Sequence, residues 1–316
     1  MRIAINKTNQ SPSPTTKPTH HNPMPMKNIL LYLPLILIII TTSCAPPQAS
    51  FDGNRAMEDV RYQVNLGPRV LGSQAHAQTV DWIVSELDSA GWEAEIQETT
   101  VGEIKIKNII GKRGSGSPGQ SPWIVLGAHY DTRMLSDKDP DPALWYQPIA
   151  GANDGASGVA ILLELARKLP ETLPVQIWLV FFDAEEDGIL PGMDIILGSR
   201  IFVQQLSGKP DGAVILDMVG DADLDIYIEK YSDPTLVSEI WKQADKLGYS
   251  KYFISAQKYA IIDDHRPFLE ASIPAVDIID FDYPYWHTSM DTLDKVSPES
   301  LEIVGKTVMA WLNSLR

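Results

Sequence analysis

Histidine and carboxylate side chains recur directly after short apolar stretches of this sequence. They are found in GAHYD (His129, Asp131), GANDGASG (Asp154), FFDAEED (Glu185, Glu186), ILDMVGD (Asp217), IIDDHRPF (Asp263, Asp264, His265) and YWHTSMD (His287). Imidazoles mixed with carboxylates are a donor set that suits Zn²⁺ or a harder divalent ion. The chain has a single Cys, which excludes both a thiolate metal site and an intrachain disulfide. We therefore expect any bound metal to be held by His and carboxylate groups.

Each motif also has an ordinary structural explanation when it is considered alone. A single His after a strand commonly hydrogen-bonds a loop, and paired acids such as Glu185 and Glu186 commonly form a solvated turn. Taken together, the acids would bring like charges into one region, which is unfavourable unless protonation or a cation offsets them. A metal is the simplest compensation. His76 is different, because it lies in a helical pattern without a nearby acid, and we expect it to be structural or exposed.

The elements that must bring these residues together follow from hydrophobic periodicity. Continuous apolar runs, typical of strands covered on both faces, occur at 123–129, 175–184, 213–220 and 274–281. Residues 92–101 and 103–111 alternate as half-buried strands do. Helical spacing occurs at 54–64, 75–89, 156–168, 198–206, 235–247 and 298–315. This alternation predicts a single-domain three-layer α/β/α sandwich with a mostly parallel central sheet, whose strands carry the chemistry at their carboxyl ends.

The first 43 residues are predicted to be an export signal. Residues 2–27 carry four basic side chains and no acid, and an apolar run of 12 residues, 29–40, follows. Such a run is short for a membrane span and typical of a secretory signal. The segment that ends at Cys44 resembles the lipobox of bacterial lipoproteins, which implies that Cys44 is lipidated and attaches the exported protein to a membrane. An ordinary signal peptide or an uncleaved anchor is the alternative.

We accordingly predict a leader at 1–43, a linker at 44–53 and one catalytic domain at 54–316. Removing residues 1–43 leaves 22 basic residues (26 − 4) against 41 acidic ones, a net charge of −19. Nucleic-acid binding is excluded, because it needs a basic face. An exported acidic domain attracts cations and ligands with a free amino group. We expect a monomer at the cell envelope, in the periplasm or outside the cell.

The order of the motifs resembles that of the zinc exopeptidases of metallopeptidase family 28, which include bacterial aminopeptidases and glutaminyl cyclases. HYD, GANDGASG, FFDAEE, LGSR, LDMVG and WHTSMDT follow one another as in that family, and the similarity covers nearly all of 54–316. The resemblance implies the zinc exopeptidase (phosphorylase/hydrolase-like) fold. It implies one zinc site formed by Asp154, Glu186 and His287. It also implies a second site, formed by His129 and Asp217 and bridged by Asp154, with Glu185 as the general base.

Two features resemble the cyclases more than the aminopeptidases. Asp263 matches a catalytic Asp of the cyclases, and Trp286 matches the Trp beside their last zinc-ligand His. The connection at 187–197 has the length of the cyclase insert, although it lacks the Trp that animal cyclases place there.

The cyclase resemblance implies that one zinc ion, Glu185, Asp217 and Asp263 convert the N-terminal Gln of peptides or proteins to pyroglutamate, with ammonia released. Trp286 would line the substrate site. The alternative is an aminopeptidase that uses two zinc ions to hydrolyse residues from free N-termini. A third hypothesis is a peptide-binding lipoprotein without enzymatic activity.

Overall fold

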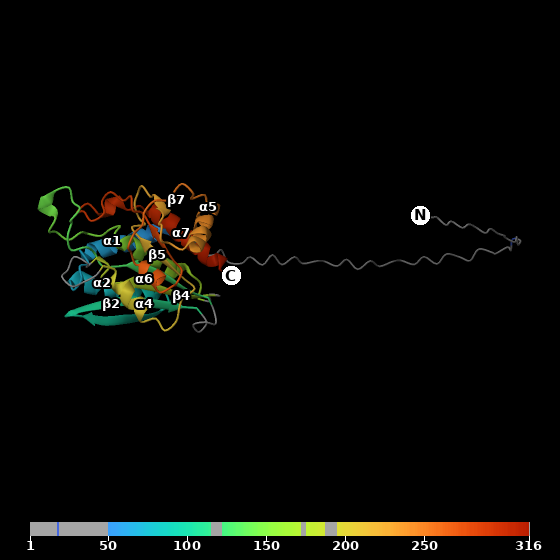
Figure 1. Cartoon of the computed structure of the whole chain (residues 1–316), viewed down its shortest axis with the longest axis horizontal. Helices are drawn as coiled ribbons and strands as arrows, with labels where there is room; N and C mark the ends of the chain where they lie inside the picture. The colour runs from blue at the N-terminus through green and yellow to red at the C-terminus, as the bar shows by residue number, and fades with distance from the viewer. Residues whose placement is uncertain (1–17, 19–49, 115–121, 172–174, 187–194, 316) are drawn as a thin grey trace, which may run out of the picture. The chain divides into compact units, whose positions relative to one another are not determined.

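The computed structural model describes residues 18, 50–114, 122–171, 175–186 and 195–315. Contacts within the chain separate residues 1–47 from residues 48–316, and the second unit is drawn in Figure 1 as helices around a central sheet. Apart from residue 18, the predicted leader lies outside the described residues, as do Cys44 and most of the 187–197 connection. Within the described ranges, no helix combines the length and the apolar character needed to cross a membrane.

A six-stranded sheet with the order β1-β2-β4-β3-β5-β8 forms the centre of the domain. Four neighbouring strands are parallel: β4 (Gln176–Phe182), β3 (Trp123–His129), β5 (Gly212–Asp217) and β8 (Ala275–Ile279). The hairpin of β1 (Glu93–Val101) and β2 (Ile104–Arg113) adds two antiparallel strands at one edge. The predicted mostly parallel sheet is therefore confirmed.

Helices cover both faces of this sheet. One face packs against α1 (Gly53–Leu66), α2 (Gln74–Ser89), α3 (Ala156–Lys168), α5 (Pro234–Lys246) and α7 (Pro298–Ser314), and the other against α4 (Leu197–Gln204) and α6 (Arg266–Glu270). Alternate side chains of β3 enter opposite layers: Ile124 and Leu126 join the larger core, whereas Trp123 and Val125 join the smaller one with Phe202. The three-layer sandwich is confirmed.

The sequence pattern does not predict the short elements. A separate two-stranded sheet pairs β6 (Ile226–Ile228) with β7 (Phe253–Gln257), and α6 has only five residues. Two 3-10 turns lie at Pro142–Leu144 and Leu293–Lys295. Elements this short carry too few residues for a period of 2 or 3.6 to be recognised.

The ordered domain begins before residue 54. Phe51 is 2% exposed, and its ring lies where a Cβ on Gly305 would approach it to 2.3 Å. Asp52 caps α1 by accepting the N–H groups of residues 54 and 55. Phe51 and Asp52 thus belong to the domain, although they fall inside the predicted linker.

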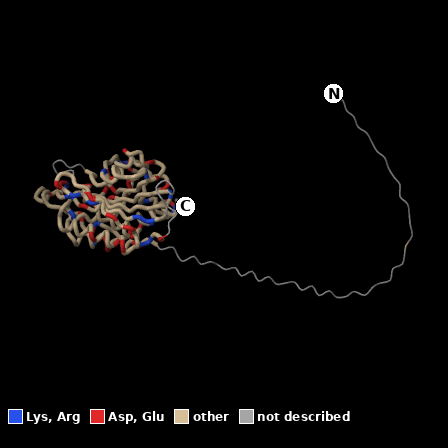
Figure 2. The backbone as a smooth tube through the Cα atoms, turned by 90° about the horizontal axis from the view of Figure 1, so that it is seen from below, with Lys and Arg blue, Asp and Glu red and all other residues tan. Residues whose placement is uncertain are grey.

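Charged residues are spread over the domain. Figure 2 shows acidic and basic positions interspersed along the backbone, with no face in that view given over to basic residues.

Candidate metal centre

Three acids and one imidazole lie at the carboxyl ends of three adjacent parallel strands. His129 is the last residue of β3 and Asp217 the last of β5, while Glu185 and Glu186 follow the end of β4. Because these strands are neighbours, their carboxyl ends lie side by side. Asp154 comes just before α3, which packs over β3. The convergence expected from the sequence is therefore present.

Two groups of side chains have the spacing of metal ligands. In the first, His287 Nε2 lies 3.3 Å from Glu186 Oε2 and 3.7 Å from Asp154 Oδ2. In the second, His129 Nε2 lies 3.1 Å from Asp154 Oδ1 and 3.1 Å from Asp217 Oδ1. In each group the possible ligand atoms lie within 4.8 Å of one another. Asp154 therefore turns one oxygen toward each group.

The first group fits a zinc ion. Ligand atoms bound to a tetrahedral zinc at about 2.0–2.1 Å lie roughly 3.3–3.4 Å apart, close to the separations found here. Asp154 Oδ2 and Glu186 Oε1 are buried and have no hydrogen-bond partner among the described residues. Burial and the charge of Glu186 raise the pKa of Asp154 well above its ordinary range. A bound cation would satisfy these oxygens and offset the crowded negative charge.

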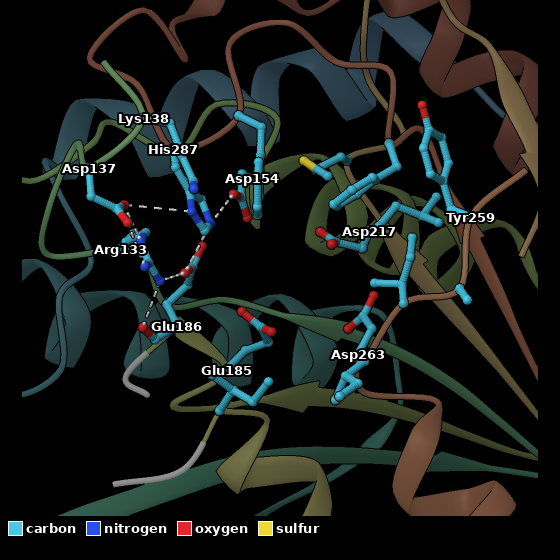
Figure 3. A pocket seen from close by; sticks show the side chains of 18 residues that line it. Arg133, Asp137, Lys138, Asp154, Glu185, Glu186, Asp217, Tyr259, Asp263 and His287 are labelled. Carbon is cyan, nitrogen blue, oxygen red and sulfur yellow. Dashed lines mark hydrogen bonds and ion pairs between the residues drawn. The ribbon is translucent and has the colours of Figure 1, made fainter. Parts of the chain in front are cut away.

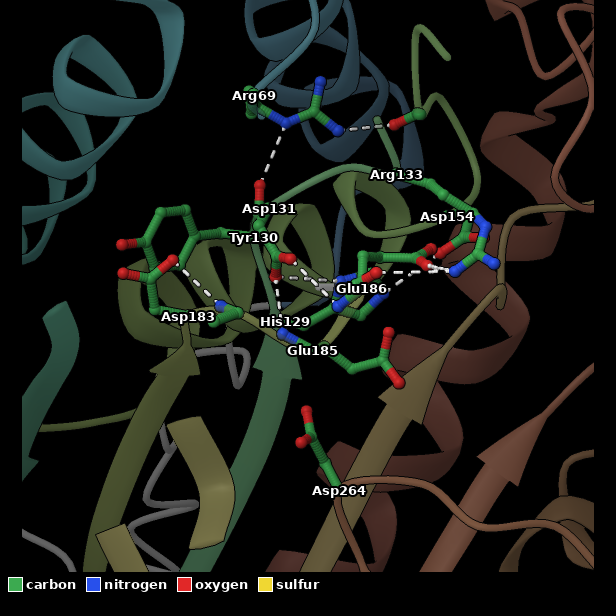
Figure 4. Close-up of polar contacts among 12 residues, drawn as sticks. Arg69, His129, Tyr130, Asp131, Arg133, Asp154, Asp183, Glu185, Glu186 and Asp264 are labelled. Carbon is green, nitrogen blue, oxygen red and sulfur yellow. Dashed lines mark hydrogen bonds and ion pairs between the residues drawn. The ribbon is translucent and has the colours of Figure 1, made fainter. Parts of the chain in front are cut away.

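Buried carboxylates outside the two groups hold the candidate ligands in position. Asp131 accepts the backbone N–H groups of Glu185 at 3.2 Å and of Glu186 at 3.1 Å (Figure 4). Asp291 accepts the N–H of Asp154 at 3.2 Å. Asp131 stands in one of the motifs recognised in the sequence but was assigned no role there, and Asp291 was not predicted as a site residue. The only signal for Asp291 in the sequence is its position in WHTSMD, four residues after His287.

Arg133 is a further residue of the site that sequence reasoning missed. Its Nη1 donates to Glu186 Oε2 at 3.0 Å, and its Nε donates to Asp137 Oδ1 at 2.7 Å. Burial opposes ionisation of Glu186, but His287, His129 and Arg133 outweigh it and hold its pKa at about 2. Glu186 is therefore ionised and available as a ligand at neutral pH.

A pocket of about 490 Å³ opens beside the first group. On its polar side the carboxylates of Glu185, Asp217 and Asp263 point toward one space (Figure 3). Apolar side chains also line the pocket, and those called here the apolar wall are Met218, Ile261, Ile262, Ile279, Phe281 and Trp286. Trp286 packs against the imidazole of His287, with ring centroids 4.0 Å apart.

Two of the acids that line the pocket have raised pKa values. Removal from water and the charge of Glu186 raise the pKa of Glu185 well above its ordinary range. Burial and the charge of Asp217 raise the pKa of Asp263 to about 6. Such groups can hold and release a proton near neutral pH.

The backbone is strained where it presents these residues. Ala184, which precedes Glu185, has φ 52°, Met218, which follows Asp217, has φ 47°, and His287 itself has φ 56°. Left-handed backbone is unfavourable for residues other than glycine and clusters at functional sites. A Cβ on Gly155 would lie 2.8 Å from the carbonyl oxygen of His129, so this position requires glycine.

Two placements differ from the sequence expectations. Asp263 does not follow a strand of the main sheet: it lies on the loop between β7 and α6 and still reaches the pocket. His76 was expected to be structural or exposed, and it is structural: it is 4% exposed, and its Nε2 lies 2.7 Å from Asp183 Oδ1.

The chain is similar to proteins of one family. Residues 108–312 match the model of peptidase family M28. A glutaminyl cyclase structure from Tannerella forsythia is 35% identical, with a TM-score of 0.77 over 84% of this chain and 99% of that one. A leucine aminopeptidase precursor structure from Bacteroides thetaiotaomicron is 33% identical, with a TM-score of 0.77 over 84% and 98% of the two chains. A bovine glutaminyl-peptide cyclotransferase-like protein is 26% identical over 282 residues, 77% of this chain and 71% of the bovine protein.

Proposed function

The chain belongs to peptidase family M28, and within that family we propose that it is a zinc-dependent glutaminyl-peptide cyclotransferase. Its substrates would be peptides or proteins with a free N-terminal Gln, and its products pyroglutamate and ammonia. The observation that carries the proposal is that the carboxylates of Asp263, Asp217 and Glu185 face one pocket beside the first group. In the cyclisation a proton moves between two nitrogen atoms and no water is consumed. Glu185 can carry that proton, while Asp217 and Asp263 can stabilise the intermediate.

Asp154, Glu186 and His287 are the proposed zinc ligands. Zinc bound there would act as a Lewis acid toward the γ-carbonyl oxygen of the substrate Gln. His287 is oriented by the ring of Trp286, and Glu186 by Arg133 and by the Asp131 carboxylate that accepts its N–H group. Outer contacts of this kind fix the direction of the ligand atoms.

Glu185 is the proposed proton carrier. In the cyclisation the substrate α-amine forms a bond to the γ-carbonyl carbon, the bond from that carbon to the side-chain amide nitrogen breaks, and ammonia leaves. One proton must pass from the attacking nitrogen to the departing one. A carboxyl group whose pKa is raised, as that of Glu185 is, can accept and return that proton near neutral pH.

Asp217, Asp263 and the apolar wall are proposed to hold the substrate. An acid that keeps its proton can donate a hydrogen bond to its neighbour, so Asp263 and Asp217 can share one proton and stabilise the tetrahedral intermediate. Trp286 and its neighbours in the apolar wall would cover the methylene groups of the Gln side chain. The negative charge of the mature chain favours approach of a peptide amine.

The second candidate function is hydrolysis by a two-zinc aminopeptidase. It is favoured by the group of His129, Asp154 and Asp217, which has ligand spacing and shares Asp154 with the first site. In that reaction Glu185 would take a proton from a water molecule and give it to the leaving amine.

One assay separates these functions. The purified protein is incubated with a Gln-initiated peptide and with a Leu-anilide, each with and without a chelator, while ammonia, pyroglutamate and free anilide are measured. Chelator-sensitive formation of pyroglutamate and ammonia supports the cyclase. Anilide cleavage without pyroglutamate supports the aminopeptidase. Absence of both activities in the zinc-loaded protein would contradict both functions.

We also propose that the protein is exported as a monomeric lipoprotein with its lipid on Cys44. The order of basic residues, a 12-residue apolar run and Cys44 supports the proposal. Labelling of the wild-type chain but not of Cys44→Ala with a fatty-acid probe would bear it out. Release of Cys44→Ala in soluble form, with the wild type retained in membranes, is the accompanying expectation.

A further inference from the structure

A fully buried cluster lies behind the polar side of the pocket. His265 is 0% exposed and stands between two carboxylates. Its Nε2 is 3.3 Å from Glu229 Oε2, and its Nδ1 is 3.5 Å from Asp277 Oδ2. These three residues are called here the Glu229–His265–Asp277 cluster. None of them belongs to either of the two groups that share Asp154.

Glu229 accepts hydrogen bonds from several donors and faces one ring nitrogen of His265. Its Oε2 accepts the N–H groups of Tyr231 and Ser232, both at 2.8 Å, and the hydroxyl of Ser232 at 3.1 Å. Its Oε1 accepts the N–H of Ile261 at 3.1 Å. A carboxylate surrounded by donors acts only as an acceptor, so the imidazole nitrogen that faces it must carry a hydrogen. The 3.3 Å contact of Nε2 with Glu229 Oε2 is an ion-pair contact without hydrogen-bond geometry, and we expect the hydrogen of His265 to be on Nε2.

Asp277 extends the cluster to the pocket. It is the central residue of β8, is 0% exposed, and neither of its oxygens has a hydrogen-bond partner among the described residues. Ligand-type atoms of Asp263, His265 and Asp277 lie within 4.8 Å of one another, and Asp263 Oδ2 is also buried without a partner. Glu229, His265, Asp277 and Asp263 therefore lie next to one another in that order, at ion-pair or ligand-type distances and without hydrogen bonds between them.

Glu229 is also connected to the apolar wall and to β8. The N–H that it accepts from Ile261 belongs to the wall. The hydroxyl of Ser232, which donates to Glu229, accepts the backbone N–H of Asp277 at 3.0 Å. Glu229 thus contacts the loop that carries Ile261, the imidazole of His265 and, through Ser232, the strand that carries Asp277.

We propose that Glu229 and His265 are positioning residues that act through Asp277 to hold Asp263 in its orientation toward the substrate. The proposal rests on the proposed cyclase function, in which Asp263 stabilises the tetrahedral intermediate. Neither Glu229 nor His265 lines the pocket, so both act on the reaction only through their neighbours. A competing explanation is a further metal ion held by Asp263, His265 and Asp277, and the test separates the two.

The test compares His265→Gln, Glu229→Gln and the double variant, each in the full chain with zinc. For each, kcat and KM on a Gln-initiated peptide, zinc content and thermal midpoint are measured. We expect kcat to fall by about 10–100-fold, as for partners that orient active groups, with KM changed less than about threefold and zinc content unchanged. The double variant should lose no more than the worse single variant, because both act on the same residue. Glu239→Gln, which alters a carboxylate bonded to Trp311 instead, should keep wild-type kcat.

Nitrogen-15 NMR of histidine in the unmutated protein provides a readout that does not depend on activity or on variant folding. We expect His265 Nε2 to carry a slowly exchanging proton. An unprotonated Nε2, a loss of bound zinc in His265→Gln, or a folded variant with wild-type kcat would overturn the proposal. If the wild type makes no pyroglutamate, the proposed function fails, and the Nε2 proton and the zinc content still decide whether the cluster is built as described.

Discussion

The carboxylate of Asp291 accepts the backbone N–H of Asp154 at 3.2 Å and so holds the residue that faces both candidate metal groups. The same carboxylate accepts the N–H of Asn153 at 2.8 Å and the hydroxyl of Tyr283 at 2.7 Å. Asp291 is fully buried, so it has no water to replace these contacts. The turn that presents Asp154 is therefore anchored by a side chain that belongs to neither candidate ligand group.

Asp291→Ala should weaken zinc binding by about 10–100-fold, because the turn before α3 would lose its acceptor and Asp154 its orientation. The measurement is a competition for zinc against a chromophoric chelator. Asp294→Ala, an exposed acid on the same segment, is the control and should bind zinc as the wild type does. Equal zinc affinity in Asp291→Ala and the wild type would mean that the anchor is dispensable.

The convergence of the site could be predicted from the sequence because it follows from topology. His129 and Asp217 end buried parallel strands, so the rule for such sheets brings them together. Asp263 and His287 lie on long loops, and the paths of such loops depend on tertiary packing. Only the family resemblance indicated the roles of these two residues. Arg133 and Asp291 carry no local pattern, since an Arg or an Asp in a loop is usually solvated. Their roles become visible only when the atoms they contact are known.

Glu185→Gln should separate proton transfer from metal binding. The amide cannot carry the proton, and we expect kcat to fall by about 10²–10⁴-fold while zinc content and KM stay near wild type. Glu186→Gln is the matched comparison, since it makes the same change one residue later in a proposed ligand and should lose zinc. Elemental analysis and steady-state kinetics on the two variants provide the measurement. A Glu185→Gln enzyme with wild-type kcat would remove Glu185 from the mechanism.

The two histidines should differ in their effect on zinc. If the cyclase works with one ion held by Asp154, Glu186 and His287, then His287→Ala should lose that ion, while His129→Ala should retain about one equivalent. A two-zinc aminopeptidase would instead bind two equivalents in the wild type and fewer in both variants. Zinc content after dialysis against trace chelator, with the thermal midpoint as a folding check, distinguishes these outcomes. Retention of a full equivalent in His287→Ala would contradict the proposed ligand set.

Asp280 should make stability fall as the pH rises. Burial and the charges of Asp221 and Asp225 raise its pKa to about 7, although it accepts the N–H groups of residues 225 and 282. Between the unfolded value of 3.8 and about 7, the folded chain keeps a proton that the unfolded chain releases. The free energy of unfolding should therefore decrease with pH across that window, by up to about 1.4 kcal/mol per pH unit. Outside the window, Asp280 should not make it depend on pH.

Asp280→Asn cannot titrate, so its stability relative to the wild type should increase from pH 4.5 to pH 7 in urea unfolding. Asp282→Asn removes an acid whose pKa is lowered, and its relative stability should move in the opposite direction below pH 4. Parallel pH profiles for Asp280→Asn and the wild type would show that Asp280 is ionised in the folded protein.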